Sequence, residues 1–252
     1  SESTGYRVYF SAGDGQTQSF STKHLVLGYG TSPALPEFVE KLAGEDVMHT
    51  ARFAYNQESL EKAKRVIVIG SGQSAGECVL QVLHNHPEAE LHWYTRSQGF
   101  LPMEYSKLGL EFFSPEYIDY FYNLPEEQRD RIRSGQDLFY KGMSEDTIAE
   151  IYDTLYERQL DTSLPQPVLQ GGVALCDIQP NTGAGEHKYR LELRHNEEGS
   201  VFSDSADFVV LGTGYAHRLP EYTEHLEPTQ QTDSQGRNEV PRDYREKPQA
   251  ES

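Results

Sequence analysis

Short apolar runs separated by glycine turns are the main pattern of the first hundred residues. Arg65–Ile69 carries a continuous apolar run with charge on one side and glycine on the other, which is typical of a parallel strand buried on both faces. Apolar residues then recur at spacings of three and four from Ser74 to about His84, which predicts a helix. Leu91–Thr95 is the next predicted strand. These segments predict a β-α-β unit of ~30 residues.

Alternating side chains predict a hairpin before this unit. Tyr6–Phe10 alternates, Gly13 and Gly15 indicate a turn, and Lys23–Leu27 is the predicted second strand. That strand runs into Gly28–Pro36, whose glycines and prolines predict a tight loop with no room for a helix. Two tetrapeptides, LGYG at Leu27 and LGTG at Leu211, are each expected to end a strand.

Residues 112–160 are expected to form a helical insertion. Pro115, Asp119 and Pro125 stand at plausible helix starts, and the apolar spacing from Thr147 to Leu160 is helical. Further strands are predicted at Leu169–Leu175, Tyr189–Leu193 and Phe208–Leu211. After about Glu221 the chain has almost no aliphatic residues, so we expect a loosely ordered tail.

Composition narrows the class of protein. The 252 residues include 22 Lys and Arg against 40 Asp and Glu, for a net charge of −18, which makes a nucleic acid an unsuitable partner. With 16 Tyr and 11 Phe the chain can build a core. No apolar run approaches the ~20 residues of a membrane span, and no charged leader precedes an apolar segment. We therefore expect a cytoplasmic protein.

The strongest motif follows the strand at Arg65–Ile69. Gly70-Ser71-Gly72-Gln73-Ser74-Ala75 reads G-x-G-x-x-A between a strand and a helix, the context of a dinucleotide-binding fingerprint. Gly70 would allow the tight turn, Gly72 the approach of a pyrophosphate, and Ala75 close helix–strand packing. The helix N-terminus would offer amides and a positive dipole end to the phosphates, which puts Gln73 and Ser74 nearest to them. A plain structural turn is the alternative.

The end of the next predicted strand indicates which dinucleotide binds. An acidic residue there would hold a ribose hydroxyl and favour NAD, but this sequence has Arg96 and Ser97. A guanidinium suits a 2′-phosphate, with the serine hydroxyl as a second donor, so NADPH is the predicted cofactor. A simple surface arginine is the alternative interpretation.

Metal binding is a weaker interpretation of the histidines. His84 and His86 flank a predicted helix end, and neither they nor His92 have a carboxylate or cysteine at ligand spacing. Cys78 and Cys176 are too far apart for a CxxC pair. The sequence therefore predicts no metal site.

Several longer segments resemble one enzyme family. They are LGYGTSPALP at Leu27, the pair His49-Thr50, VIVIGSGQSAGE at Val66, WYTRS at Trp93, MEYSKLGLEFFSPEYIDYFYNLPEEQRDRI at Met103, YKGMSEDTIAEIYDTLYERQL at Tyr140, and LGTGY at Leu211. Together they resemble the flavin- and NADPH-dependent monooxygenases that N-hydroxylate ornithine, lysine or diamines for hydroxamate siderophores. The resemblance covers Lys23 to about Leu219.

The resemblance implies an α/β fold: a Rossmann-like NADPH-binding domain with a helical insertion, flanked by partial strands of an FAD-binding domain. Residues 1–36 would be a partial FAD-domain β segment, 37–215 the NADPH-binding domain and 216–252 a truncated return to the FAD domain. The glycine-rich FAD fingerprint and the closing segment of such enzymes have no match here. We therefore expect a fragment that is inactive alone and does not itself bind FAD, which the full-length protein would carry.

The resemblance also bears on the substrate. Amino-acid hydroxylases carry polar residues before F-x-P and within the insertion, at positions matched here by Leu110, beside Glu111, and by Phe139, beside Tyr140. An apolar residue cannot hydrogen-bond an amino-acid head group, so the resemblance is closer to the putrescine or cadaverine branch, with 2,4-diaminobutyrate and lysine still open. The opposing interpretation is that Leu110 and Phe139 are core residues.

In the implied reaction, NADPH reduces FAD, and O2 supplies the oxygen that is transferred to the terminal amine of a small molecule. The sequence identifies no catalytic acid, base or nucleophile, and a homo-oligomer of the full-length form stays open. Two alternatives also remain. One is an NADP-binding sensor or assembly module without redox chemistry, and the other is a different class of flavin monooxygenase.

Overall fold

The computed structural model describes residues 5–11, 13, 15–182, 187–218, 220 and 241–242. By internal contacts the chain divides into two compact units. One comprises Ser1–Ser32, His217–Glu239 and Lys247–Ser252, and the other Pro33–Ala216 and Val240–Glu246. The predicted loose tail after Glu221 lies almost wholly outside the described residues. In the part of the chain that is described, no helix is long and apolar enough to cross a membrane.

The first unit contains an antiparallel hairpin of β1 (Tyr6–Ser11) and β2 (Thr17–Thr22), in which Tyr6 pairs with Thr22. The hairpin is as predicted, but the prediction of Lys23–Leu27 as its second strand is wrong. The turn is short, so pairing with β1 is already complete at Thr22, and within the described part of the chain Lys23–Leu27 pair with no strand. LGYG therefore does not end a strand, whereas LGTG ends one as predicted, because its Leu211 is the last residue of β11.

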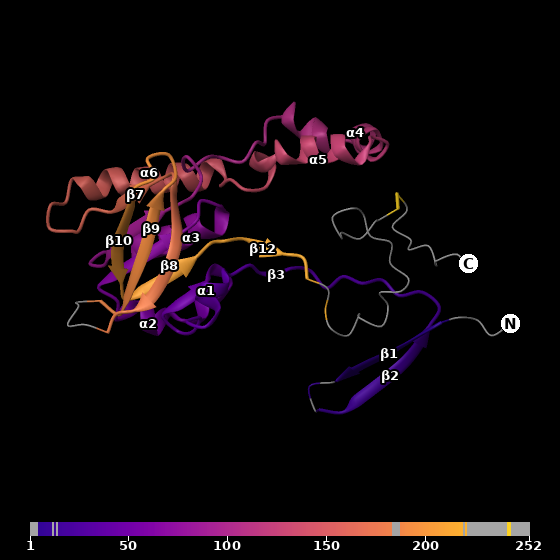
Figure 1. Ribbon diagram of the computed structural model, residues 1–252, viewed down its shortest axis with the longest axis horizontal. Coiled ribbons are helices and arrows are strands. Elements are labelled where there is room, and N and C mark those ends of the chain that lie inside the picture. Colours follow the sequence, from indigo (N-terminus) through magenta and orange to yellow (C-terminus); the bar gives the residue numbers. More distant parts are fainter. Residues whose placement is uncertain are drawn as a thin grey trace. The chain divides into compact units, whose positions relative to one another are not determined.

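A five-stranded parallel sheet forms the centre of the second unit (Figure 1). Its strand order is β4-β11-β5-β6-β7, and every pairing is parallel. The strands are β4 (Val47–His49), β11 (Phe208–Leu211), β5 (Arg65–Ile69), β6 (Glu90–Tyr94) and β7 (Val168–Gln170). Helix α3 (Gln73–Asn85) connects β5 to β6, as the sequence predicts.

The two faces of this sheet are covered differently. Val66, Leu91 and Trp93 pack against α3 and α6 (Glu145–Gln159) in one apolar cluster. Ile67 and Val209 point to the opposite face and pack against an antiparallel meander. The meander consists of β8 (Val173–Pro180), β9 (Tyr189–His195) and β10 (Val201–Ala206), in the order β10-β9-β8. This three-layer α/β arrangement confirms the predicted fold class.

The predicted strand Leu169–Leu175 is wrong as a single element. Gly171 and Gly172 interrupt it, and Gly172 has φ +71°, so the chain turns from β7 of the parallel sheet into β8 of the meander. Strand β10 was not predicted because its sequence, VFSDSA, has little apolar character.

Helices between β6 and β7 form the insertion, and α4 and α5 extend away from the sheet (Figure 1). Ser114 caps α4, because its hydroxyl accepts a hydrogen bond from the Tyr117 amide at 3.2 Å, and Pro115 takes the first helical position. Asp119 therefore lies within α4, so the prediction that it stands at a helix start is wrong. The elements are η2 (Gly109–Phe113), α4 (Pro115–Tyr122), α5 (Glu126–Ser134), η3 (Asp137–Phe139) and α6.

The remaining elements are short. Glu37–Glu40 (α1), Thr50–Tyr55 (η1) and Gln57–Glu61 (α2) lie between the loop and β5, and Ser32–Pro33 (β3) pairs with Tyr215–Ala216 (β12). His49 ends β4, and its ring nitrogen Nε2 lies 2.9 Å from the Gly214 carbonyl. The Ala34 amide donates to the same carbonyl at 3.0 Å, so this loop is tied to the segment that follows β11.

Candidate dinucleotide-binding site

The glycine turn after β5 is built on close backbone packing. Gly70 has φ +122°, and a Cβ atom there would collide with the carbonyl of Gly212, which follows β11. A Cβ on Gly212 would in turn lie 2.8 Å from the Cβ of Ala75 in the first turn of α3. Glycine is thus needed at both positions, and Ala75 is small enough to let the helix approach the strands.

The N-terminus of α3 opens directly from this turn. The first helical amides with protein acceptors are those of Ala75 and Gly76, which donate to the Gly72 carbonyl at 3.0 and 3.1 Å. Within the described part of the chain, the amides of Gly72, Gln73 and Ser74 have no such acceptor. A Cβ on Gly72 would meet its nearest neighbour, the Lys141 carbonyl oxygen, at 3.7 Å, which is an ordinary van der Waals contact rather than a collision. Such a helix end suits an anion.

The side chain of Gln73 connects α3 to α6. Its Oε1 accepts from the Ser144 amide at 2.8 Å, and its Nε2 donates to Thr147 Oγ1 at 2.9 Å. Ser144 is the N-cap of α6, so this side chain fixes the start of one helix against the start of the other. Only the backbone amide of Gln73 is left for a phosphate, a division of roles that the motif alone does not reveal.

Arg96 and Ser97 follow β6 beside the same turn, and both are exposed. The connection runs through Thr95, whose hydroxyl donates to Ser71 Oγ at 3.0 Å and accepts from the Ser97 amide at 3.2 Å. The carbonyl of Ser97 also accepts from Gly172 at 2.7 Å. The backbone is therefore anchored while both side chains reach solvent, next to the open helix end. The structure thus brings all eight residues of the predicted cofactor set to one edge of the sheet.

The four predicted substrate-proximal residues separate into two pairs. Phe139 and Tyr140 line an apolar cavity of about 230 Å³ within the insertion, whereas Leu110 and Glu111 belong to η2 and are exposed. Leu110 is 44% exposed, so it is not the buried core residue of the opposing interpretation. The cavity is lined by Phe112, Phe113, Tyr117, Ile118, Phe121, Gln136, Phe139 and Tyr140.

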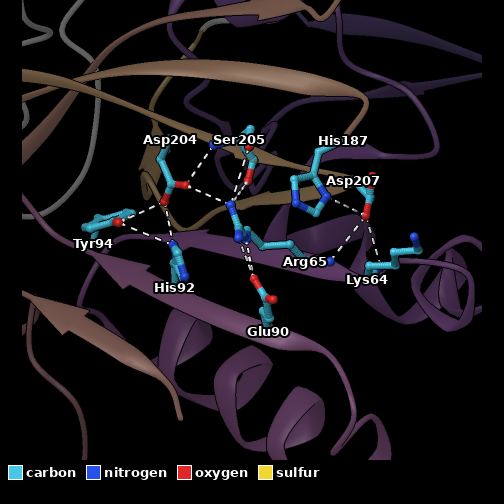
Figure 2. Close-up of polar contacts among 9 residues, drawn as sticks. All are labelled: Lys64, Arg65, Glu90, His92, Tyr94, His187, Asp204, Ser205 and Asp207. Carbon is cyan, nitrogen blue, oxygen red and sulfur yellow. Dashed lines mark hydrogen bonds and ion pairs between the residues drawn. The ribbon is translucent and has the colours of Figure 1, made fainter. Parts of the chain in front are cut away.

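A second polar cluster lies between the parallel sheet and the meander (Figure 2). Asp204 of β10 contacts the His92 ring at 2.5 Å and accepts from the Tyr94 hydroxyl at 2.8 Å, and Arg65 lies 3.4 Å away. Burial alone would raise the pKa of Asp204, but hydrogen bonds from His92, the Ser205 amide and Tyr94, with the charge of His92, outweigh it and lower this pKa. The side chains of Asp204, His92, Tyr94 and Arg65 thus partner one another.

Asp207 is partnered in the same way at the start of β11. Its carboxylate lies 3.1 Å from the His187 ring and accepts from the amides of Lys64 and Arg65 at 2.9 and 3.2 Å (Figure 2). It also accepts from the Lys188 amide at 3.2 Å. Burial alone would raise the pKa of Asp207, but the hydrogen bonds from His187 and from the amides of Lys64 and Arg65 outweigh it and lower this pKa. Among the described residues, no group of three or more His, Cys, Asp or Glu side chains could hold a metal ion.

The sequence alone does not predict that two charged residues of the insertion, Asp137 and Lys141, belong near the glycine turn. Asp137 of η3 and Lys141 form an ion pair at 2.8 Å. The carbonyl of Lys141 is the nearest atom to the position of a Cβ on Gly72. Their spacing of four residues is common on protein surfaces, and only the fold brings them to the glycine turn.

Comparison with known proteins agrees with this geometry. The sequence profile of the L-lysine 6-monooxygenase/L-ornithine 5-monooxygenase family matches residues 1–217. The chain belongs to this family. The resemblance inferred from the sequence motifs is thereby confirmed.

Two relatives within this monooxygenase family are notable. The rhizobactin siderophore biosynthesis protein RhbE of Rhizobium meliloti is 38% identical over 228 residues, which are 88% of this chain and 50% of RhbE. A putrescine N-hydroxylase of Shewanella oneidensis is 36% identical over 232 residues, 91% of this chain and 45% of that protein. The chain thus spans about half the length of these curated relatives.

A solved structure of the family has the same fold. The FAD-bound DfoA of Erwinia amylovora, a cadaverine monooxygenase of the desferrioxamine pathway, superposes with a TM-score of 0.87 at 34% identity. The superposition covers 96% of this chain and 56% of DfoA.

Proposed function

We propose that this chain is the NADPH-binding portion of an FAD- and NADPH-dependent monooxygenase that N-hydroxylates an aliphatic diamine, putrescine or cadaverine, or lysine, for hydroxamate siderophore biosynthesis. The observation that carries the proposal is the glycine turn, with its open helix end and the neighbouring Arg96. Family membership supplies the reaction class. We include in the proposal the division into residues 1–36, 37–215 and 216–252, and a cytoplasmic location.

The residues present fit a phosphorylated dinucleotide. Because Gly72 carries no side chain, a pyrophosphate would reach the amides of Gly72, Gln73 and Ser74, which have no acceptor among the described residues. The Arg96 guanidinium and the Ser97 hydroxyl would hold the 2′-phosphate. Ser71, fixed by Thr95, would keep the turn and the end of β6 at a constant separation. When bound, NADPH would supply the hydride that reduces the flavin.

No flavin contact is assigned to this chain. Its described residues contain one strand–glycine turn–helix unit, which the NADPH proposal already uses. The task of the chain in the reaction is therefore to bind the dinucleotide, orient it and discriminate between its forms.

The diamine preference rests on Phe139 and Tyr140. Both line a largely apolar, aromatic cavity with no cationic side chain in its lining, and a carboxylate placed there would lose hydration without gaining an ion-pair partner. The methylene chain of a diamine has no such cost. Putrescine N-hydroxylase and cadaverine monooxygenase among the relatives give the proposal further support.

The test uses the full-length enzyme with putrescine, cadaverine, lysine and ornithine. Hydroxylamine formed per NADPH oxidised should be highest for a diamine. Phe139→Asn should reduce the diamine-to-lysine ratio of kcat/KM by about tenfold, because a polar group would partner the head group. Leu138→Asn is the matched control, since Leu138 is exposed and does not line the cavity.

Two outcomes would count against the proposal. If an amino acid gives the highest kcat/KM in the unmodified enzyme, the diamine assignment is wrong. If no amine yields a hydroxylamine, the reaction class itself is wrong for this protein.

A further inference from the structure

The segment that carries Lys141 is fixed against the glycine turn. A Cβ on Gly142 would lie 2.6 to 2.8 Å from backbone atoms of Leu101–Met103, so this glycine is packed directly on that strand-like segment. The next residue, Met143, is buried, and its sulfur contacts the position where a side chain of Gly76 would begin. The backbone of Lys141 therefore has a defined position 3.7 Å from the Cβ site of Gly72.

Asp137 places a negative charge near Arg96, the residue proposed to hold the 2′-phosphate. Lys141 Nζ lies 2.8 Å from its carboxylate, and the Tyr140 hydroxyl donates to the same oxygen at 3.0 Å. The hydrogen bond from Lys141 is the main cause of a lowered pKa for Asp137, and the charge of Arg96 contributes to the same direction. Asp137 thus forms an ion pair with Lys141, and the charge of Arg96 also acts on its carboxylate.

We propose that Lys141 is a specificity-determining residue for NADPH over NADH, which acts by neutralising Asp137 beside Arg96. The inference rests on the proposed dinucleotide site and goes beyond it. The 2′-phosphate is the only difference between the two dinucleotides, and it brings a charge approaching −2 to the place where Arg96 lies. An unpaired carboxylate nearby would repel it, in a chain whose net charge is already −18.

Lys141 is therefore a positioning residue for the local charge, and it need not touch the dinucleotide. Both members of the pair are about half exposed, at 53% and 50%, so water and salt screen the effect. The expected change is several-fold, and it should shrink as salt is added.

The experiment measures the affinity of the purified full chain for NADPH and for NADH at low and high salt. Lys141→Met should weaken NADPH binding about three- to tenfold and change NADH binding less than twofold. Asp137→Asn should tighten NADPH binding about two- to fivefold. The double variant should return to within about twofold of the unmodified chain, and Lys141→Arg should keep its preference.

The matched control is Lys62→Met. Like Lys141, Lys62 forms an exposed ion pair with a carboxylate four residues before it: its Nζ lies 2.9 Å from Glu58 Oε1. Lys62 stands at the C-terminal end of the short helix α2, before the amino end of β5. The Lys62→Met substitution should leave the affinities for NADPH and for NADH unchanged. If Lys62→Met weakens NADPH binding as much as Lys141→Met does, the effect is one of net charge and the inference is overturned.

Failure of this inference differs from failure of the proposed site. An unmodified chain without preference for NADPH would refute the site and, with it, the role of Lys141. A clear preference that Lys141→Met does not change would refute Lys141 alone. If Lys141→Met does not fold, the sign of the Asp137→Asn effect decides, because a structural role for Asp137 predicts weaker rather than tighter NADPH binding.

Discussion

Two polar regions of the second unit use their hydrogen-bonding groups in opposite ways. In the cluster of Figure 2, Asp204 and Asp207 have their partners within the protein. At the glycine turn, the amides of Gly72, Gln73 and Ser74 have no acceptor among the described residues. Buried groups that satisfy one another stabilise the fold, whereas backbone donors left open at a surface are available to a ligand.

The difference has a local cause in the sequence. Glu90, His92 and Tyr94 alternate along β6, so all three side chains point to the face that the meander covers, where they meet Arg65 and Asp204. The turn has glycines at positions 70 and 72 instead, and the amides of Gly72, Gln73 and Ser74 have no acceptor among the described residues. The first region is therefore expected to control stability, and the second to control dinucleotide binding.

The largest expected effect on the free energy of unfolding distinguishes Gly70 from Gly72, two glycines of the same turn. Gly70→Ala should lower the free energy of unfolding by about 4 kcal/mol, because it combines φ +122° with a collision at the Gly212 carbonyl. Gly72→Ala should change it by less than about 0.5 kcal/mol, since Gly72 has φ −83° and no neighbour closer than 3.7 Å. Urea denaturation of both variants gives the comparison, and equal losses would contradict the described packing.

Removing a partnered carboxylate should come next. Asp207→Ala leaves the amides of Lys64, Arg65 and Lys188 and the ring of His187 without their acceptor, at a cost of about 3 kcal/mol. NADPH affinity of the folded variant should stay within twofold, because this carboxylate lies at the opposite end of β11 from Gly212. Asp153→Ala, on the exposed face of α6, is the control for both measurements. A large loss of NADPH affinity in folded Asp207→Ala would break the separation of the two regions.

The smallest of these stability effects depends on pH. Because the folded-state pKa of Asp204 lies below its ordinary value of ~3.9, its contribution is fully present above about pH 4 and is lost as the pH falls through the folded pKa. Asp204→Asn should therefore reduce the difference in unfolding free energy between pH 7 and pH 3. Urea melts of both proteins at the two pH values measure it, and an unchanged difference would show that Asp204 is not stabilised by its partners.

Local patterns were enough to predict the central fold. The runs at Arg65–Ile69 and Phe208–Leu211 have a composition that specifies buried parallel strands, and the helical spacing after Ser74 fixes α3. The predictions of strands were wrong where pairing with a segment elsewhere in the chain, rather than the local sequence pattern, decides the structure. Thr17–Thr22 has no strong apolar pattern and becomes a strand because β1 lies beside it.

The site could be predicted only in part for the same reason. The glycine motif and Arg96 are close in sequence to the strands that position them. The hydrogen bonds of Gln73 with Ser144 and Thr147 join residues 71 and 74 positions apart, and Asp204 lies 112 positions from His92. No periodicity reports such pairs. The position of Lys141 at the turn depends in turn on the packing of Gly142.

The central claim is that the glycine turn and Arg96 form an NADPH site, and its most direct test is a titration of the chain with NADPH and NADH, before and after Arg96→Ala. The unmodified chain should bind NADPH at least tenfold more tightly. The variant should lose about 1.5–3 kcal/mol of NADPH affinity, roughly ten- to hundredfold, with little change for NADH. Arg131→Ala, on the exposed surface of α5, should change neither. Equal affinity of the unmodified chain for both dinucleotides would contradict the account.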